Sequence, residues 1–240
     1  MKLSVIVPAY NEEKRLPYTL REIDKYLAKQ DYDYEIIVAN DGSTDRTALV
    51  VKDMVSEIKG LRLIDNSENH GKGYVVYKGL LEAKGDFRIF TDSDNSTSID
   101  QIEKMWPEFD NGCDIVIGSR DIKGAKLVPP QPWYREMLGK VFCILVKIIV
   151  GLKHISDSQC GFKAFKKEVV EEIVPRCKIE GFGFDPEILV LAQKMHYKIK
   201  EIPVVWKNDA HSKVSVKSMA VAVFELLKIR WNLITGKYGI

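Results

Sequence analysis

Short apolar segments alternate with helix-like segments over the first half of the chain, and this alternation restricts the fold more than any other feature. Apolar runs of this length between turn residues are typical of buried strands. A chain of this kind forms an open, mostly parallel sheet with helices on both faces, an α/β fold. We predict strands at 3–7, 34–39, 61–64, 87–90 and 114–118, and helices at 15–29, 46–58, 74–83 and 99–109.

Each predicted strand leads into a polar motif. These motifs begin after Val7, Ala39, Ile64, Thr91 and Ile117. In open α/β sheets the ligand binds outside the carboxyl ends of the strands. The sequence therefore predicts one binding site, assembled from the loops at that edge of the sheet.

The fourth strand leads into Asp92-Ser93-Asp94 and further small polar residues. Two carboxylates at a strand end can converge on one cation, and Mg²⁺ or Mn²⁺ often binds through one or two carboxylates plus substrate phosphates. An acidic turn that caps the next helix uses the same residue types and is the alternative. The metal interpretation is favoured because the other polar motifs are expected at the same edge.

Composition and charge exclude several classes of protein. The 240 residues carry a formal net charge of +2, so no basic field points to nucleic acid, and we expect no such partner. The four cysteines are scattered, which favours reduced thiols in a cytoplasmic protein over disulfides or zinc ligands. Met1-Lys2 runs straight into the first strand, without a signal-peptide core or membrane span, so we expect the cytosolic side of a membrane.

Two nucleotide-binding classes can be tested on their loops. The segment Pro8–Glu12 contains no glycine, whereas a dinucleotide fold needs glycine there so that the backbone can approach a pyrophosphate. The segment His70–Gly73 lacks the first glycine and the following Ser or Thr of a P-loop. A dehydrogenase or P-loop enzyme is therefore disfavoured.

Four motifs at their intervals resemble those of family 2 glycosyltransferases, whose fold is GT-A: Val7-Pro8-Ala9-Tyr10-Asn11-Glu12, Asp41-Gly42-Ser43-Thr44-Asp45, Asn69–Gly73 and Asp92-Ser93-Asp94. The resemblance covers roughly the first 120 residues strongly. Weaker motifs at 157–163, 184–187 and 212–213 resemble the dolichyl-phosphate glucose and mannose synthases, and the 157–163 motif is closer to the glucosyltransferase branch.

The resemblance implies roles for the matching positions. The donor-binding set is Pro8, Ala9, Tyr10, Glu12, Asp41, Lys72, Asp92, Gln159 and Lys213. Within it, Asp41 would bind the base, Lys72 would lie near the base and ribose, and Lys213 would close on the pyrophosphate. Asp92 and Asp94 would hold the metal, Mg²⁺ or Mn²⁺. The catalytic set is Asp94, Arg120, Arg135 and Asp157.

Within the catalytic set, the two arginines would bind the acceptor phosphate, since a guanidinium holds phosphate bidentately. Asp157 would face the donor sugar together with Gln159. Ion pairing of Arg120 with Asp121 or Asp94, and a surface position for Arg135, are the alternatives.

Two later segments combine apolar and basic residues. Segment 137–152 is strongly apolar but contains Lys140 and Lys147, and it is too short and too charged to span a bilayer. Segment 219–234 is similar, and from Ala210 onward five Lys or Arg oppose one acid. Such helices suit peripheral binding to an anionic membrane surface. A core position or a homo-oligomer interface is the alternative use.

The resemblance implies an inverting, metal-dependent glycosyltransferase that moves a sugar from a nucleotide donor to a polyprenyl (dolichyl) phosphate, giving a lipid-linked sugar for protein glycosylation. UDP-glucose or UDP-N-acetylglucosamine is the favoured donor. Transfer of mannose from GDP-mannose, transfer to a glycan hydroxyl, and a non-catalytic sugar-nucleotide-binding protein are the alternatives. We expect a single GT-A domain at 1–210, with a nucleotide-binding half at 1–120 and an acceptor half at 121–210, followed by a basic loop and amphipathic helix at 211–240.

Overall fold

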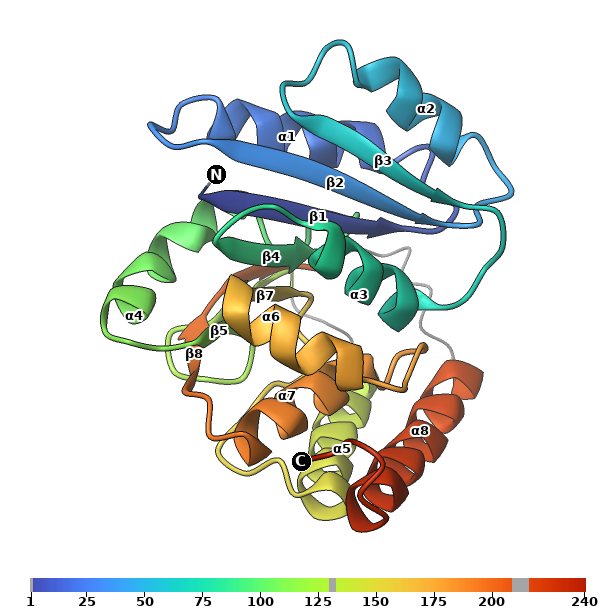
Figure 1. Cartoon of the computed structure of the whole chain (residues 1–240), viewed down its shortest axis with the longest axis vertical. Helices are drawn as coiled ribbons and strands as arrows, with labels where there is room; N and C mark the ends of the chain where they lie inside the picture. Colours follow the sequence, from blue (N-terminus) through green and yellow to red (C-terminus); the bar gives the residue numbers. More distant parts are fainter. Residues whose placement is uncertain (1, 130–132, 209–215) are drawn as a thin grey trace.

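The computed structural model describes the backbone of residues 2–129, 133–208 and 216–240, and the side chains of these residues except 133–136 and 216–219. Seven strands form the central sheet in the order β3-β2-β1-β4-β7-β5-β8 (Figure 1). All run parallel except β7, which is antiparallel to both of its neighbours. The strands are β1 (Leu3–Ala9), β2 (Tyr34–Asp41), β3 (Leu61–Asn66), β4 (Phe87–Thr91), β5 (Ile115–Ser119), β7 (Phe162–Lys166) and β8 (Ile199–Pro203).

The central strands β1, β2 and β5 are buried along their whole length, which explains their nearly continuous apolar runs. In β1, Val5 and Val7 point into one core and Ile6 into the other. In β4, Ile89 and Phe90 divide in the same way. The alternation of side chains along a strand therefore supplies two hydrophobic cores from one apolar run.

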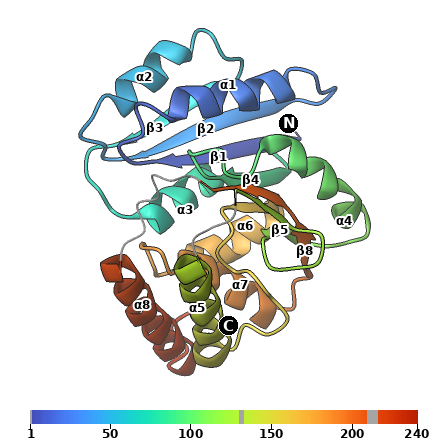
Figure 2. The same ribbon diagram turned by 180° about the vertical axis from the view of Figure 1, so that it is seen from behind.

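Helices cover the two faces of the sheet (Figures 1 and 2). One core is closed by α1 (Leu16–Leu27), α2 (Thr47–Met54), the 3₁₀ helix η1 (Ile99–Lys104) and α4 (Trp106–Asp110). The other is closed by α3 (Lys72–Glu82), α5 (Trp133–Val150), α6 (Lys167–Ile173), the 3₁₀ turn η2 (Val174–Arg176), α7 (Phe184–Lys194) and α8 (Val216–Ile234). The α/β fold predicted from the alternation is confirmed.

The single helix predicted at 99–109 is wrong in one respect, because the segment divides into η1 and α4 at Met105. Pro107 lies in the first turn of α4. Proline has no backbone N–H and cannot continue a preceding helix, but it fits the first turn of a new one. The spacing of the apolar residues alone did not predict this break in the helix.

A small second sheet and a helix pair complete the fold. Strands β6 (Lys126–Val128) and β9 (Val205–Lys207) pair in parallel beside the main sheet. Helices α5 and α8 lie side by side at one end of the molecule, and Tyr238 packs into the same core (Figures 1 and 2). Helices thus occupy both apolar-basic segments, while the domain boundary at residue 210 stays a prediction. Within the described ranges, no helix has both the length and the apolar character needed to cross a bilayer.

Candidate active site

The polar motifs meet at one edge of the sheet. The parallel strands bring their carboxyl ends there, as predicted. Because β7 is antiparallel, it brings its amino end, with the motif at 157–161, to the same edge. Thr91 pairs with Phe162, and the backbone N–H of Asp92 donates to the carbonyl of Gly161 at 3.2 Å. Motifs far apart in the sequence therefore form one site.

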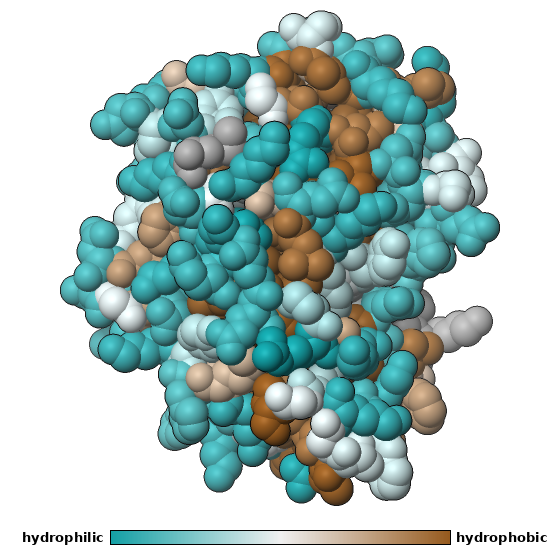
Figure 3. All heavy atoms as spheres, in the orientation of Figure 1, coloured by the Kyte–Doolittle hydropathy of each residue, from teal (hydrophilic) through white to brown (hydrophobic). Residues whose placement is uncertain are grey.

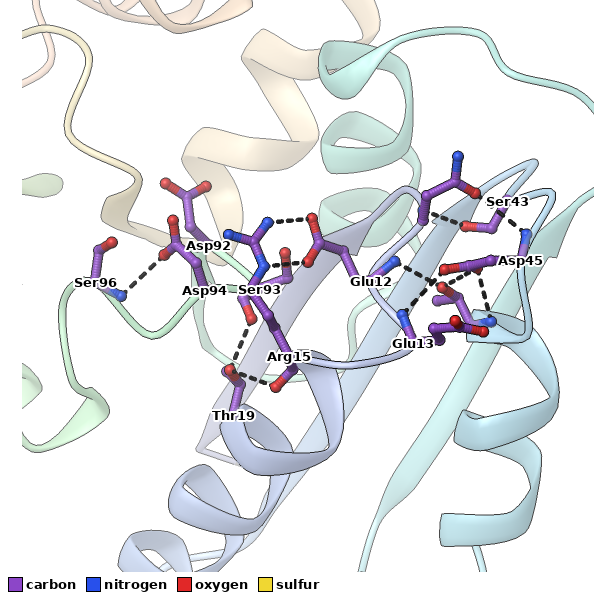
Figure 4. Close-up of polar contacts among 12 residues, drawn as sticks. Glu12, Glu13, Arg15, Thr19, Ser43, Asp45, Asp92, Ser93, Asp94 and Ser96 are labelled. Atoms are coloured by element: carbon purple, nitrogen blue, oxygen red, sulfur yellow. Dashed lines mark hydrogen bonds and ion pairs between the residues drawn. The ribbon is translucent and has the colours of Figure 1, made fainter. Parts of the chain in front are cut away.

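The loops after β1 and β2 are held together by hydrogen bonds. The backbone N–H of Glu12 donates to Thr47 Oγ1 at 2.8 Å, and that of Glu13 donates to Asp45 Oδ2 at 3.2 Å (Figure 4). Asp45 Oδ1 also accepts from the backbone N–H of Thr47 at 2.9 Å, at the start of α2. Side-chain acceptors at a helix start satisfy N–H groups that have no partner within the helix. This network holds the end of β1, where the predicted donor residues Pro8, Ala9 and Tyr10 lie.

Glu12 is buried and pairs with an arginine that the sequence did not reveal. Arg15 donates through Nε and Nη2 to the two carboxylate oxygens of Glu12, at 2.7 and 2.6 Å. In Figure 4, Arg15 reaches from the start of α1 to Glu12, and Asp92 and Asp94 appear on its other side. The spacing of three residues at a helix start was the only sequence signal for this pair.

Asp41 organises the loop at 69–71. Its carboxylate accepts from the side chain of Asn69 at 2.9 Å and from the backbone N–H groups of His70 and Gly71 at 2.8 and 3.0 Å. Asp41 is almost completely buried. The carboxylate thus holds the loop that leads into α3, and its predicted contact with the base stays a prediction.

Asp92, Asp94 and Lys72 form the centre of the site. Lys72, the first residue of α3, places Nζ 2.6 Å from Asp92 Oδ1. Burial opposes charge on Lys72, but Asp92 and Asp185 outweigh it, so the pKa of Lys72 lies above its ordinary value. Burial, with the neighbouring charge of Asp92, raises the pKa of Asp94. Because its pKa is raised beside the Asp92 carboxylate, Asp94 marks a place that added positive charge would stabilise.

The Asp-Ser-Asp loop is held from both sides. Thr19 Oγ1, on α1, donates to the carbonyl of Ser93 at 2.7 Å (Figure 4). On the other side, Gly161 packs so closely that a Cβ atom there would lie 1.9 Å from Asp92 Oδ2. Only glycine leaves room for the Asp92 carboxylate in this position, which gives a physical reason for the glycine in the 157–163 motif.

A buried ion pair extends the site toward α7. Lys163, on β7, donates to Asp185 Oδ1 and to the carbonyl of Cys160, both at 2.6 Å. Burial raises the pKa of Asp185, although Lys163 and Lys72 oppose this shift. Asp185 therefore lies within electrostatic reach of Lys72 and Asp92, which connects the later motifs to the first four.

Glu187, two residues further along α7, has a structural position. It is fully buried and accepts from the hydroxyls of Tyr77 and Tyr238, at 2.9 and 2.7 Å, and from the backbone N–H groups of Lys178 and Ile179. A carboxylate offers about four acceptor positions, and all are used.

Arg120 follows β5 and pairs with Asp157. Its Nε and Nη2 donate to the two Asp157 oxygens at 2.7 and 2.9 Å. Neither alternative partner considered from the sequence, Asp121 or Asp94, makes this contact. The side chain of Arg135 and the whole of Lys213 lie outside the described residues.

Residues 4–174 match the family described as glycosyl transferase family 2. The chain belongs to glycosyl transferase family 2. A dolichyl-phosphate beta-glucosyltransferase of Trichomonas vaginalis is 36% identical to this transferase over 95% of its chain and 72% of the relative. Proteins of the same description from Homo sapiens and Saccharomyces cerevisiae are 33% and 32% identical, covering 99% and 98% of this chain and 77% and 76% of theirs.

Solved structures confirm the GT-A fold of the transferase. A glucosyl-3-phosphoglycerate synthase of Mycobacterium tuberculosis, solved with Mn²⁺, UDP and phosphoglyceric acid, superposes with a TM-score of 0.70. The likeness covers 100% of this chain and 79% of the synthase at 18% identity. At this identity the likeness concerns the fold alone.

The donor groups of the transferase fit a divalent cation that shares its coordination with substrate. The carboxylates of Asp92 and Asp94 offer hard oxygen atoms of the kind that Mg²⁺ and Mn²⁺ bind. Among the described residues, no group of three or more His, Cys, Asp or Glu side chains is arranged to hold a metal. Mg²⁺ and Mn²⁺ usually complete their coordination with water and substrate phosphates. Lys72 donates to Asp92 at the same place, which shows that this carboxylate attracts positive charge.

The predicted residues of the transferase divide into three groups. Asp92, Asp94 and Lys72 make direct contacts or share a charge environment, and Glu12 and Asp41 hold the neighbouring loops. Arg120, Asp157 and Gln159 form the third group, a second cluster in which the backbone N–H of Gln159 donates to Asp157 at 3.0 Å. The ligand contacts assigned to all these residues stay predictions.

Proposed function

We propose that this family 2 transferase moves glucose from UDP-glucose to dolichyl phosphate, with inversion at the anomeric carbon. The observation that carries the proposal is the pairing of two clusters at one edge of the sheet. One cluster, with Asp92, Asp94 and Lys72, suits a diphosphate with a cation, and the other, with Arg120, suits a phosphate monoester. The names of the relatives, dolichyl-phosphate beta-glucosyltransferases, support this donor and this acceptor.

The donor is proposed to lie over the ends of β1, β2 and β4, against Pro8, Ala9, Tyr10 and Asp41. Asp92 and Asp94 would hold Mg²⁺ or Mn²⁺. A bound divalent ion stabilises the negative charge of a departing nucleoside diphosphate. Lys72 keeps its positive charge because Asp92 and Asp185 raise its pKa, and it adds a fixed cation beside the same phosphates. Mn²⁺ with UDP in the mycobacterial synthase agrees with this arrangement in a protein of the same fold.

The acceptor brings its own nucleophile. A phosphate monoester has a second pKa near about 6, so its oxygen is already anionic at neutral pH. A lone pair of this oxygen forms the bond to the anomeric carbon. The bond from that carbon to the β-phosphate oxygen breaks, and UDP leaves with the electron pair. No proton is transferred, and therefore no carboxylate base is required.

The acceptor also explains two exposed apolar faces. On α5, Phe142, Val146 and Val150 are buried, whereas Met137, Val141, Ile144 and Ile148 form an exposed apolar stripe on the opposite side. On α8, Ala222, Leu226 and Ile229 are buried, and the exposed stripe is Val221, Phe224, Leu227, Trp231 and Ile234. We call these two stripes the apolar face.

A helix with a second apolar stripe opposite its buried one is normally covered on both of these sides. Because the long chain of a polyprenyl phosphate lies in a bilayer, we propose that the apolar face rests on the cytosolic surface of the same membrane. Lys147 and Lys228 belong to the same two helices and suit anionic headgroups. Hydrophobic and hydrophilic atoms are mixed over this end of the molecule in Figure 3.

A transfer assay tests the reaction. Purified protein is incubated with Mg²⁺ or Mn²⁺, radiolabelled UDP- or GDP-sugars and a short polyprenyl phosphate. We expect label from UDP-glucose to enter the organic phase, and Asp94→Asn to lower the rate by about 100-fold or more, as for loss of transition-state charge stabilisation. Asp53→Asn, an exposed carboxylate on α2, is the matched control and should leave the rate unchanged.

Three outcomes would contradict the proposal. Transfer of label from GDP-mannose alone would show that the donor is GDP-mannose and not UDP-glucose. Transfer only to a sugar hydroxyl would show that the acceptor is a glycan and not a lipid phosphate. Nucleotide binding without any turnover would indicate a binding protein rather than an enzyme.

A further inference from the structure

The guanidinium of Arg120 is held in place on two sides. Along one edge, Nε and Nη2 donate to Asp157 Oδ2 and Oδ1 at 2.7 and 2.9 Å. The backbone N–H of Arg120 also donates to Asp157 Oδ2, at 3.0 Å. A parallel, bidentate pair of this kind sets the plane of the guanidinium as well as its position.

An aromatic ring covers one face of the same guanidinium. Arg120 Cζ lies 5.6 Å from the centre of the Trp206 ring. Trp206 belongs to β9, and its pairing with Leu127 of β6 holds it there. Arginine stacks on aromatic rings in this distance range, and the contact is worth more when it is partly shielded from water. The small second sheet therefore has a direct contact with the site.

Asp157 has no acceptor capacity left for a substrate. Its oxygens accept four hydrogen bonds, three from Arg120 and one from the backbone N–H of Gln159. A carboxylate offers about four such positions. The side chain is completely buried, and although burial alone would raise its pKa, Arg120 outweighs it and lowers the pKa to about 2. Asp157 thus stays anionic.

The segment that carries Asp157 is itself anchored. The backbone N–H groups of Ser156 and Asp157 donate to the two carboxylate oxygens of Glu201, at 2.8 and 3.0 Å. Glu201 lies on β8, which pairs with β5 immediately before Arg120. The arginine and its partner are therefore held by neighbouring strands of one sheet.

We propose that Asp157 and Trp206 are positioning residues for Arg120, which they orient so that its remaining N–H groups bind the phosphate of the acceptor. An arginine side chain has five N–H donors, and the ion pair uses two of them. The inference rests on the proposed function, because it assumes an acceptor with a phosphate group. It assigns Asp157 to the acceptor side, in place of the contact with the donor sugar predicted from the sequence.

Orientation matters here because an arginine on the surface has many conformers. Holding the guanidinium before the acceptor binds removes an entropic cost that would otherwise weaken binding. Loss of Asp157 or Trp206 should therefore change the KM for the acceptor and leave the KM for the donor unchanged.

Steady-state kinetics with both substrates varied test the inference. Asp157→Asn keeps the size of the side chain but removes its charge and one acceptor oxygen. We expect the KM for polyprenyl phosphate to rise about tenfold or more, the loss of a charge-assisted hydrogen bond. Trp206→Leu should raise it by about three- to tenfold, and Trp206→Phe should restore most of the loss. The donor KM should stay within about twofold of the wild-type value, since neither residue contacts the donor cluster of Asp92, Asp94 and Lys72.

Two controls separate positioning from general stability. Glu35→Gln removes another buried carboxylate, paired with Arg62 at the far edge of the sheet, and should leave the acceptor KM unchanged. In an Arg120→Ala background, Asp157→Asn and Trp206→Leu should have no further effect on the acceptor KM, because residues that act through one group are not additive. If Asp157→Asn does not fold, Trp206→Leu, whose side chain is only half-buried, carries the test.

The results distinguish this inference from the proposed function. If the wild-type protein transfers sugar to lipid phosphate but the variants change the donor KM, or add fully to Arg120→Ala, the positioning role is wrong and the function stands. A carboxylate titration in the pH profile of turnover that disappears in Asp157→Asn would make Asp157 a base and overturn the inference. If the wild-type protein transfers nothing to any lipid phosphate, the function and the inference fall together.

Discussion

Two aspartates of the site differ in ionisation because their neighbours differ. Asp157 faces the guanidinium of Arg120, and its pKa lies at about 2. Asp94 is partly buried beside Asp92, and its pKa is raised. One carboxylate is therefore a permanent anion that holds a cationic side chain, while the other gains stability when positive charge is added. With a pKa of about 2, Asp157 lacks the character of a general base near neutral pH, which agrees with an acceptor that arrives as an anion.

The ion pair of Asp157 gives a prediction for stability against pH. The folded-state pKa of about 2 lies below the ordinary value of about 3.9, so the pair stabilises the fold above about pH 4 and loses this contribution as the pH falls toward 2. The contribution is about 2–3 kcal/mol. We expect the difference in unfolding free energy between the wild type and Asp157→Asn to be constant above about pH 5 and to shrink below about pH 4.

Denaturant unfolding at a series of pH values measures this difference. Asp53→Asn, on the exposed surface of α2, is the control and should give a small difference that does not change with pH. A difference for Asp157→Asn that is equal at pH values near 2 and 7 would show that ionisation of Asp157 does not stabilise the fold.

The sequence identified Arg120 and Asp157 as candidates but not their pairing. The two residues are separated by 37 positions, and only the insertion of β7 between β4 and β5 brings them together. Arg15 and Trp206 were missed for a similar reason. Neither belongs to a recognisable motif, and each was identified only by one contact in the folded chain, Arg15 with Glu12 and Trp206 with Arg120.

At the scale of elements, one short loop connects two helices to the donor cluster. The segment at 178–183 is held on one side by Glu187 and by Glu225 of α8, which accepts from the backbone N–H of Gly183 at 2.7 Å. On the other side, the carbonyl of Glu180 accepts from the backbone N–H of Tyr74, in the first turn of α3. The loop therefore packs against the turn of α3 that carries Lys72.

Gly73 gives the second prediction, because it is the closest point of this contact. A Cβ atom at Gly73 would lie 2.6 Å from Phe184 Cβ and 2.8 and 2.9 Å from two backbone carbonyl oxygens. Alanine in a helix is favoured over glycine by roughly 0.5–1 kcal/mol. Overpacking against backbone costs about 1–3 kcal/mol. This cost exceeds the gain in helix propensity, so Gly73→Ala should destabilise the fold. We also expect weaker binding of UDP, since the turn with Lys72 must move.

Gly139 provides the matched control in α5. A Cβ atom there meets nothing within 4 Å, so Gly139→Ala should be neutral or slightly stabilising. Denaturant unfolding and calorimetry with UDP measure both effects. If Gly73→Ala is as stable as Gly139→Ala and binds UDP like the wild type, the close packing of the loop on α3 has no functional weight.

The elements themselves were largely predictable, and their order in the sheet was not. Apolar runs and helical spacing located the five parallel strands of the first half, because buried parallel strands need continuous apolar sequence. The position of β7 depends on pairing with strands far away in the sequence, for which a single sequence has no local signal. The same limit applies to β6 and β9, which are short and half-exposed.

At the scale of the whole molecule, both helices of the apolar face are also linked to the active site, α5 directly and α8 through the loop at 178–183. On α5, Cys143 lies beside Ser158 and Arg120, and burial raises its pKa to about 11. On α8, Glu225 holds the loop that packs against α3. If the apolar face rests on a bilayer, the proposed phosphate-binding arginine is held next to the interface in which a lipid phosphate lies. The position of the molecule on the membrane would then bring the acceptor to the site without extracting its chain from the lipid.

This arrangement predicts that single charges on the apolar face reduce binding to vesicles while leaving the chemistry intact. Phe224→Asp and Ile148→Asp each replace an exposed apolar side chain, and we expect about tenfold weaker binding to vesicles of phosphatidylcholine and phosphatidylserine, since burying one such side chain is worth about 1.5–3 kcal/mol. Leu49→Asp, which changes an exposed leucine on α2, should bind like the wild type because α2 covers the other core. All three variants should retain activity toward a short, water-soluble polyprenyl phosphate. Equal flotation of the three variants with vesicles would contradict the membrane role, and a wild-type dimer that Phe224→Asp dissociates would assign the apolar face to a second copy of the chain instead.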